Sequence, residues 1–106
     1  MSATTVCRLD EVAPDSAVRR DVNGHRLAIV RIGENDVYVI GDRCSHADYS
    51  LSEGELDADE LTLECWKHGS TFSLRTGEPD GLPAFKPVPT YEAMVDGDEI
   101  KVVLDV

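Results

Sequence analysis

Apolar residues in this chain occur in short runs, and polar and turn-forming residues separate one run from the next. Short runs punctuated by turns are typical of β-strands rather than of long helices. The pattern therefore predicts an all-β chain. The predicted strands cover residues 5–9, 17–22, 26–32, 36–40, 61–64, 71–74, 91–95 and 99–104.

The turns between these runs predict how the strands connect. Asn23-Gly24-His25 lies between the second and third runs, and Asn-Gly is a strong hairpin signal because both central turn residues need positive φ. Gly33-Glu34-Asn35 continues the meander, and Asp96-Gly97-Asp98 forms a last hairpin. Residues 50–56 are compatible with one helical turn. We expect a single domain over residues 1–106.

Two short clusters carry the candidate chemistry: Cys44-Ser45-His46 and Cys65-Trp66-Lys67-His68. Each offers one thiolate and one imidazole, which indicates a metal site. A zinc finger usually takes both Cys from one loop and both His from a helix, whereas here each loop supplies one of each. That arrangement suits a [2Fe-2S] cluster with two Cys on one iron and two His on the other. A zinc site remains the alternative from the residues alone.

At these positions the chain resembles the Rieske family. The resemblance extends beyond the two clusters to Leu51, Gly54, Gly69, Phe72, Thr76-Gly77, Pro83 and Tyr91. It implies one [2Fe-2S] cluster per chain, bound by Cys44, His46, Cys65 and His68. It also implies the Rieske fold: an antiparallel β-sandwich base with a small two-loop cluster-binding subdomain at about residues 42–86.

Several positions near the clusters bear on the reduction potential that the resemblance implies. High-potential relatives have a disulfide between two extra Cys, where this chain has Tyr49 and Lys67, and a Tyr hydroxyl where it has Phe72. Ser70 is retained, and its hydroxyl is expected to bond a bridging sulfide. Fewer donors stabilise the reduced cluster less, so we expect a potential in the lower half of the range of roughly −150 to +300 mV.

Charge narrows the class of partner. Ten Lys and Arg against 21 Asp and Glu give a formal net charge of −11. Nucleic acids and anionic membranes need a cationic face, so neither is expected as a partner. Between Arg43 and Lys67 every charged residue is acidic, which either aids solubility or steers the protein toward a basic docking patch. Arg43, Lys67 and Lys86 place some positive charge close to the proposed cluster.

Other features set expectations for the remaining residues. No apolar run is long enough to span a bilayer or to resemble a signal peptide, so we expect a cytoplasmic protein. Of three Cys only Cys7 is left over, and we expect it to be a small buried strand residue. His25 is expected to be exposed and without a role. Gly69 either lets the backbone approach the cluster or is an ordinary turn glycine. Residues 82–87 resemble the family's Pro loop, and Trp66 either packs, shields the cluster or contributes to docking.

The resemblance implies an electron carrier rather than an enzyme. We expect a monomeric ferredoxin that takes electrons from a flavin-dependent NAD(P)H reductase and delivers them to a terminal oxygenase that hydroxylates aromatic compounds. The chain carries neither a two-His, one-carboxylate iron domain nor a dinucleotide fingerprint, so it is neither of those partners. The alternatives are a role in iron–sulfur assembly or another redox pathway, a structural zinc module, and the nitrite-reductase small-subunit type.

Overall fold

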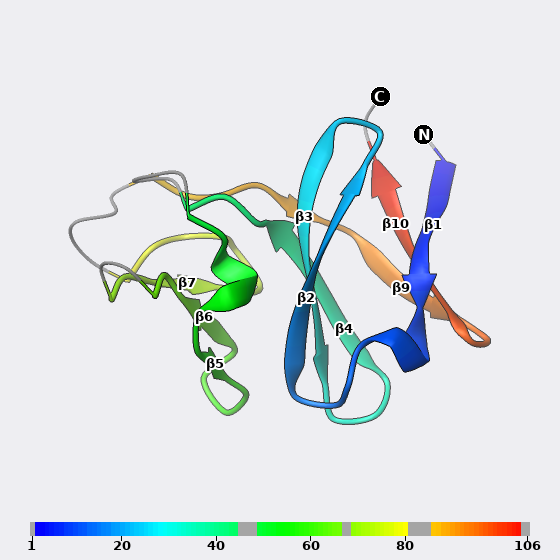
Figure 1. The fold of residues 1–106 in the computed structure, drawn as a ribbon, viewed down its shortest axis with the longest axis horizontal. Helices are drawn as coiled ribbons and strands as arrows, with labels where there is room; N and C mark the ends of the chain where they lie inside the picture. The colour runs from blue at the N-terminus through cyan, green and yellow to red at the C-terminus, as the bar shows by residue number, and fades with distance from the viewer. Residues whose placement is uncertain (1, 45–48, 67–68, 81–85, 105–106) are drawn as a thin grey trace.

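The computed structural model describes residues 2–44, 49–66, 69–80 and 86–104, which are mostly short strands (Figure 1). Two single 3-10 turns, η1 (Leu9–Glu11) and η2 (Leu51–Glu53), are the helical elements of this part of the chain. The all-β prediction is confirmed. The strands are β1 (Ser2–Arg8), β2 (Ser16–Val22), β3 (His25–Ile32), β4 (Asp36–Gly41), β5 (Leu56–Asp57), β6 (Thr62–Glu64), β7 (Thr71–Ser73), β8 (Thr90–Tyr91), β9 (Ala93–Asp96) and β10 (Glu99–Leu104).

The strands form three antiparallel sheets. One sheet has the order β1-β10-β9 and a second the order β2-β3-β4-β8; these two make the base. The third, with the order β5-β6-β7, lies to one side of the base, on the left in Figure 1. No helix of the described ranges is long and apolar enough to cross a membrane.

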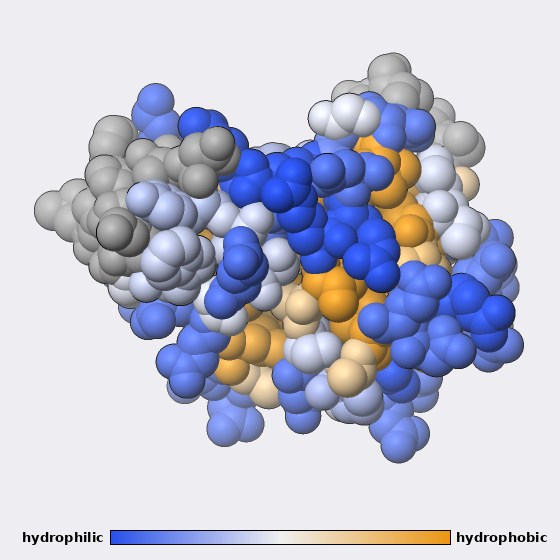
Figure 2. Space-filling model, viewed as in Figure 1, coloured by the Kyte–Doolittle hydropathy of each residue, from blue (hydrophilic) through white to orange (hydrophobic). Residues whose placement is uncertain are grey.

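β3 is the central strand of the molecule, because both of its faces are buried. Leu27 and Ile29 pack into the core between the two sheets of the base. Ala28 and Val30 point the opposite way, as alternation along a strand requires, and pack into a second core beneath the third sheet. Figure 2 shows the outer side of this arrangement: hydrophilic residues form a blue band along β2, and hydrophobic residues show between β2 and β1.

The hairpin from β2 to β3 forms as the Asn-Gly pair predicts. Asn23 and Gly24 have φ of 51° and 82°, and Val22 pairs directly with His25. Positive φ at both central residues gives the turn whose twist matches the flanking strands. His25 is therefore the first residue of β3.

Other predicted elements differ from the observed ones. The single strand expected over residues 91–95 is divided at Glu92: β8 pairs with β4 in one sheet, and β9 pairs with β10 in the other. The backbone thus crosses between the two sheets of the base, and the Glu92 carbonyl still accepts a bond from the Val103 N–H at 2.9 Å. β1 begins earlier than predicted, at Ser2, because it pairs along the whole of β10. β5 was not predicted.

Candidate metal centre

Both cysteines of the candidate site lie just after a strand. Cys44 follows β4, and Cys65 follows β6 directly. Each is fully buried, and both belong to the core beneath the third sheet, with Leu51, Leu63 and Phe72. Neither forms a disulfide. The structure therefore brings two cysteines from separate loops into one apolar environment.

The two cysteine loops close in the same way. The Cys44 N–H donates to the Tyr49 carbonyl at 2.9 Å, and the Cys65 N–H donates to the Ser70 carbonyl at 2.7 Å. In each loop the acceptor comes five residues after the cysteine. The ends of both loops are thus fixed by backbone bonds, as a site that must hold a ligand in defined geometry requires.

Gly69 belongs to the second closure. Its φ is +78°, and its N–H donates to the Cys65 carbonyl at 2.9 Å. No described atom lies within 4 Å of the position that a Cβ would take. Among the described residues, the turn conformation rather than a close approach therefore explains this glycine.

His46 and His68 lie outside the described residues, as do Lys67 and residues 82–85 of the expected Pro loop. Their role as ligands stays a prediction. The described part of the site can still be tested against the expected group. Two buried cysteines in no disulfide lie on twin loops, and each is followed in sequence by a histidine within three residues. These residue types fit the two-sulfur, two-nitrogen donor set of a Rieske cluster.

The two loops are also joined to each other. A Cβ on Gly54 would collide with the Glu64 carbonyl, and the Glu64 N–H donates to the Glu55 carbonyl at 2.8 Å. The chain that leaves the first loop therefore packs directly on the residue before Cys65. This close approach explains why the family resemblance includes Gly54. A side chain would not fit at this position, whereas the φ of Gly54 is one that other residues also adopt.

Sequence reasoning missed an ion pair beneath the first loop, between a buried carboxylate and a partly buried arginine. Asp42 is fully buried, and the Arg26 Nε donates to its Oδ2 at 3.1 Å. Arg26 also reaches the Ser50 Oγ at 2.8 Å. The signal available in the sequence was weak: an acidic residue directly after an apolar strand and two residues before Cys44.

Several predicted neighbours of the site are in place. Phe72 is fully buried in the same core as both cysteines, and Ser70 is nearly so. Beyond the undescribed part of the Pro loop, the Val88 N–H donates to the Gly77 carbonyl at 2.8 Å. A Cβ on Gly77 would meet the Val88 carbonyl, so the returning chain packs tightly on the end of the loop after β7.

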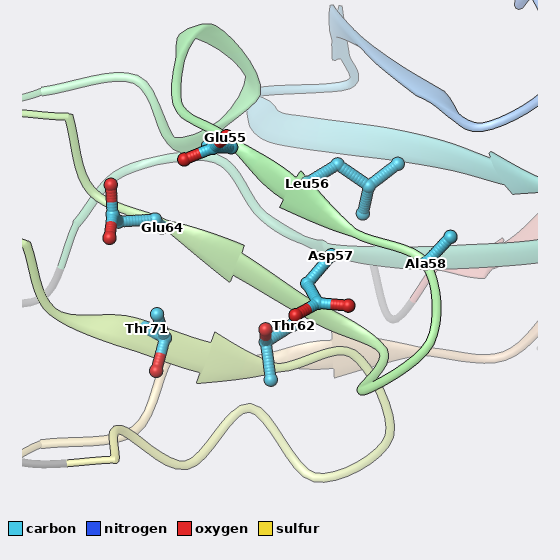
Figure 3. A pocket seen from close by; sticks show the side chains of 7 residues that line it. All are labelled: Glu55, Leu56, Asp57, Ala58, Thr62, Glu64 and Thr71. Carbon is cyan, nitrogen blue, oxygen red and sulfur yellow. The ribbon is translucent and has the colours of Figure 1, made fainter.

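The outer face of the third sheet is polar and acidic. A depression on it is lined by Glu55, Asp57, Thr62, Glu64 and Thr71, with Leu56 and Ala58 at one side (Figure 3). A neighbouring depression adds Glu60, Glu78 and Asp80. Four acidic residues of the run between Arg43 and Lys67 therefore line this face of the small sheet: Glu55, Asp57, Glu60 and Glu64.

The predictions for two residues outside the site, Cys7 and His25, can be compared with the structure. Cys7 is buried in β1, as predicted, and burial raises the pKa of its thiol. The predicted exposure of His25 was wrong. It is partly buried, its ring meets the Tyr91 ring edge-on at 5.8 Å, and its Nδ1 lies 3.5 Å from the Tyr91 hydroxyl. Its position at the start of β3, next to the turn, brings it against Tyr91 of β8.

Comparison with known proteins decides the family. Residues 2–92 match the Rieske [2Fe-2S] domain. The chain belongs to the Rieske family. The matched residues include both cysteine loops and most of the base. Membership of this family implies a [2Fe-2S] cluster.

Relatives of this Rieske protein include ferredoxins of dioxygenase systems. It is 33% identical over 105 residues to the ferredoxin component of biphenyl 2,3-dioxygenase from Rhodococcus jostii (strain RHA1), covering 99% of this chain and 95% of the relative. The ferredoxin of carbazole 1,9a-dioxygenase from Nocardioides aromaticivorans IC177 matches with a TM-score of 0.92 and 38% identity, covering 99% and 100% of the two chains.

A third match comes from a solved complex of reduced oxygenase and oxidized ferredoxin in carbazole 1,9a-dioxygenase. It has a TM-score of 0.83 and 33% identity, covering 95% of this chain and 92% of that one. The Rieske chain is thus a ferredoxin of the dioxygenase type, an electron carrier and not a complete enzyme.

Proposed function

We propose that this Rieske ferredoxin takes single electrons from a flavin-dependent NAD(P)H reductase and delivers them to a terminal oxygenase that hydroxylates aromatic rings. The observation that carries the proposal is the pair of twin cysteine loops within a chain that matches dioxygenase ferredoxins over nearly its whole length. Because the proposed reductase uses NAD(P)H, we place the protein in the cytoplasm. We also propose that it is a monomer.

The ligands in this proposal are Cys44 and Cys65 on one iron and His46 and His68 on the other, with one cluster per chain. When bound, such a cluster accepts and returns one electron at the histidine-ligated iron, because neutral imidazoles donate less charge than thiolates. Cys44 and Cys65 contribute buried sulfur donors on backbone-anchored loops. Leu51, Leu63 and Phe72 exclude water from the thiol side.

The described neighbours also set how strongly the protein stabilises the reduced state. Phe72 offers no hydroxyl to a ligand sulfur, whereas Ser70 follows the second loop and is nearly buried. A site with few hydrogen-bond donors stabilises added negative charge less. We therefore propose a potential in the lower half of the Rieske range.

Docking of both partners is proposed near His46 and His68, in the cluster-binding subdomain expected at about residues 42–86. The complex solved for the carbazole system supports contact with an oxygenase. The acidic face of the third sheet lies on the same subdomain. A basic patch on a partner would be attracted to that face, which would raise the rate of association more than the affinity.

The test is reconstitution of the full chain with iron and sulfide under anaerobic conditions. We expect about two irons and two acid-labile sulfides per chain, a red-brown colour that bleaches with dithionite, and a rhombic EPR signal. The loaded protein should restore electron flow between the reductase and oxygenase of a dioxygenase system. His46→Ala and His68→Ala are the matched variants and should abolish the EPR signal.

Two results would contradict the proposal. A colourless protein with one zinc per chain after iron-replete anaerobic preparation would favour the zinc module. A spectrum that shows four sulfur donors would exclude the histidine ligands.

A further inference from the structure

A buried carboxylate lies beneath the first cysteine loop and is not among the proposed ligands. Asp42 comes two residues before Cys44, and its side chain is inaccessible to solvent. Its Oδ2 accepts from the Arg26 Nε at 3.1 Å, and its Oδ1 accepts from the Ser52 N–H at 2.9 Å. One carboxylate therefore binds both the central strand of the base and the chain that leaves the loop.

Arg26 connects the two ends of the same loop. While its Nε holds Asp42 on the incoming side, its terminal nitrogen donates to the Ser50 Oγ at 2.8 Å on the outgoing side. The backbone reinforces the arrangement. The Leu51 N–H donates to the Asp42 carbonyl at 2.6 Å, and the backbones of Arg43 and Ser50 form an isolated antiparallel β-bridge. The guanidinium thus spans the base of the loop from a fixed position in β3.

Stability alone does not explain a charge pair in this position. Removing an ion pair from water costs about as much as the pair returns, and apolar residues of similar volume often serve a fold equally well. What a fully hydrogen-bonded pair adds is a defined geometry, because Arg26 and Asp42 each have directional contacts on two sides. The element that receives this geometry is the loop that begins with Cys44.

We propose that Arg26 and Asp42 are positioning residues that hold the first loop in the shape required for cluster binding. The pair fixes Asp42 and Ser50 on the two sides of Cys44 and Tyr49, so both ends of the loop are held at its base. The inference rests on the proposed role of Cys44 as a ligand. It predicts that the pair controls how tightly the cluster is retained and, through its charges, the potential of the cluster.

The test compares Asp42→Ala, Asp42→Asn and Arg26→Gln in the full reconstituted chain. Asp96→Ala is the matched control, since it removes the exposed Lys101–Asp96 pair on β9 and β10, whose atoms are 2.9 Å apart. Iron release to a chelator is timed under conditions where circular dichroism shows all variants folded. The potential is measured by titration of molecules that still hold the cluster.

We expect Asp42→Ala to release iron at least about tenfold faster than the parent, since it removes the carboxylate that binds the partly buried Arg26 and the acceptor of the Ser52 N–H. Asp42→Asn keeps an acceptor for the Ser52 N–H, so its release rate should be intermediate. Asp42→Asn should raise the potential and Arg26→Gln should lower it, because the cluster gains negative charge on reduction. A purely structural role would not shift the potential in opposite directions.

The proposal is overturned if the Asp42 and Arg26 variants release iron at the rate of Asp96→Ala and keep the parent potential. It is also overturned if release accelerates only in proportion to global unfolding while the potential stays unchanged. Failure of the proposed function would look different, because the parent chain itself would then not bind a [2Fe-2S] cluster.

Discussion

The rings of Tyr49 and Trp66 meet edge-on between the two cysteine loops, with centroids 5.1 Å apart and planes at 83°. Tyr49 closes the first loop through its carbonyl, and Trp66 follows Cys65 in the second. Trp66 is 52% exposed, so burial does not explain the contact. It is a side-chain connection between the loops, and one of its residues, Tyr49, stands where high-potential relatives are expected to have one Cys of a disulfide.

We predict that this contact couples the two loops energetically. In a double-mutant cycle with Tyr49→Leu and Trp66→Leu, the coupling free energy of unfolding should be about 0.5–1.5 kcal/mol, as for other edge-on aromatic pairs. Urea unfolding of the loaded protein measures it. Met94, the other large exposed apolar residue of the described chain, provides the control: Tyr49→Leu and Met94→Leu should be additive.

A substitution at Gly54 should loosen the second loop. Gly54→Ala places a methyl group against the Glu64 carbonyl, and such overpacking costs roughly 1–3 kcal/mol. Because Glu64 precedes Cys65, we expect a lower free energy of unfolding and a lower iron content after purification. Gly24→Ala is the control: its φ of +82° makes the variant unfavourable by about 1 kcal/mol, yet it lies in the β2–β3 turn. Equal iron loss in both variants would contradict the local explanation.

The reduction potential should lie in the lower half of the range of roughly −150 to +300 mV. Phe72→Tyr should raise it, because a hydroxyl in this core could donate to a ligand sulfur. His68→Cys should keep part of the cluster and lower the potential, since a thiolate stabilises ferric iron. Redox titration followed by EPR measures all three. A parent midpoint above about +200 mV would refute the argument from missing donors.

Electron transfer with a partner should slow as salt is added. If the acidic face steers docking, the second-order rate should fall between about 20 mM and about 300 mM salt, over which the screening length shortens severalfold. Glu55→Gln with Glu64→Gln should weaken that dependence, since both carboxylates line the same depression (Figure 3). Asp36→Asn with Glu92→Gln, two exposed acidic residues of the base, makes an equal charge change and should not. Stopped-flow mixing measures the rates.

Cys7 should destabilise the base at alkaline pH. Burial raises the pKa of its thiol, and Arg20 opposes this effect in part. The folded state therefore holds the proton more tightly than the unfolded state, so this contribution is complete below the unfolded pKa and is lost as pH rises through the folded value. The free energy of unfolding, measured with urea, should fall between about pH 7.5 and about pH 10, and it should fall less for Cys7→Ala than for the parent. Equal losses would contradict the assignment.

The sequence predicted those features that local chemistry specifies. Asn23-Gly24 specified the hairpin because its backbone geometry demands those residues, and the cysteine–histidine spacing specified the loops. Features that depend on distant partners were missed. Arg26 and Asp42 are 16 residues apart, and Tyr49 meets Trp66 only after the loops pack. The division of residues 91–95 between two sheets left no local signal, because Glu92 fits an alternating strand pattern equally well.

The double burial of β3 has a consequence for how this ferredoxin tolerates change. Because neighbouring residues of the strand face opposite ways, a slip of one position would exchange Leu27 and Ile29 with Ala28 and Val30. Bulky side chains would then press on the compartment that holds Cys44 and Cys65, while the sandwich would be left underfilled. The register of this single strand therefore determines the packing around the two cysteines and the packing between the two sheets of the base. A change in one of these cores would change the other.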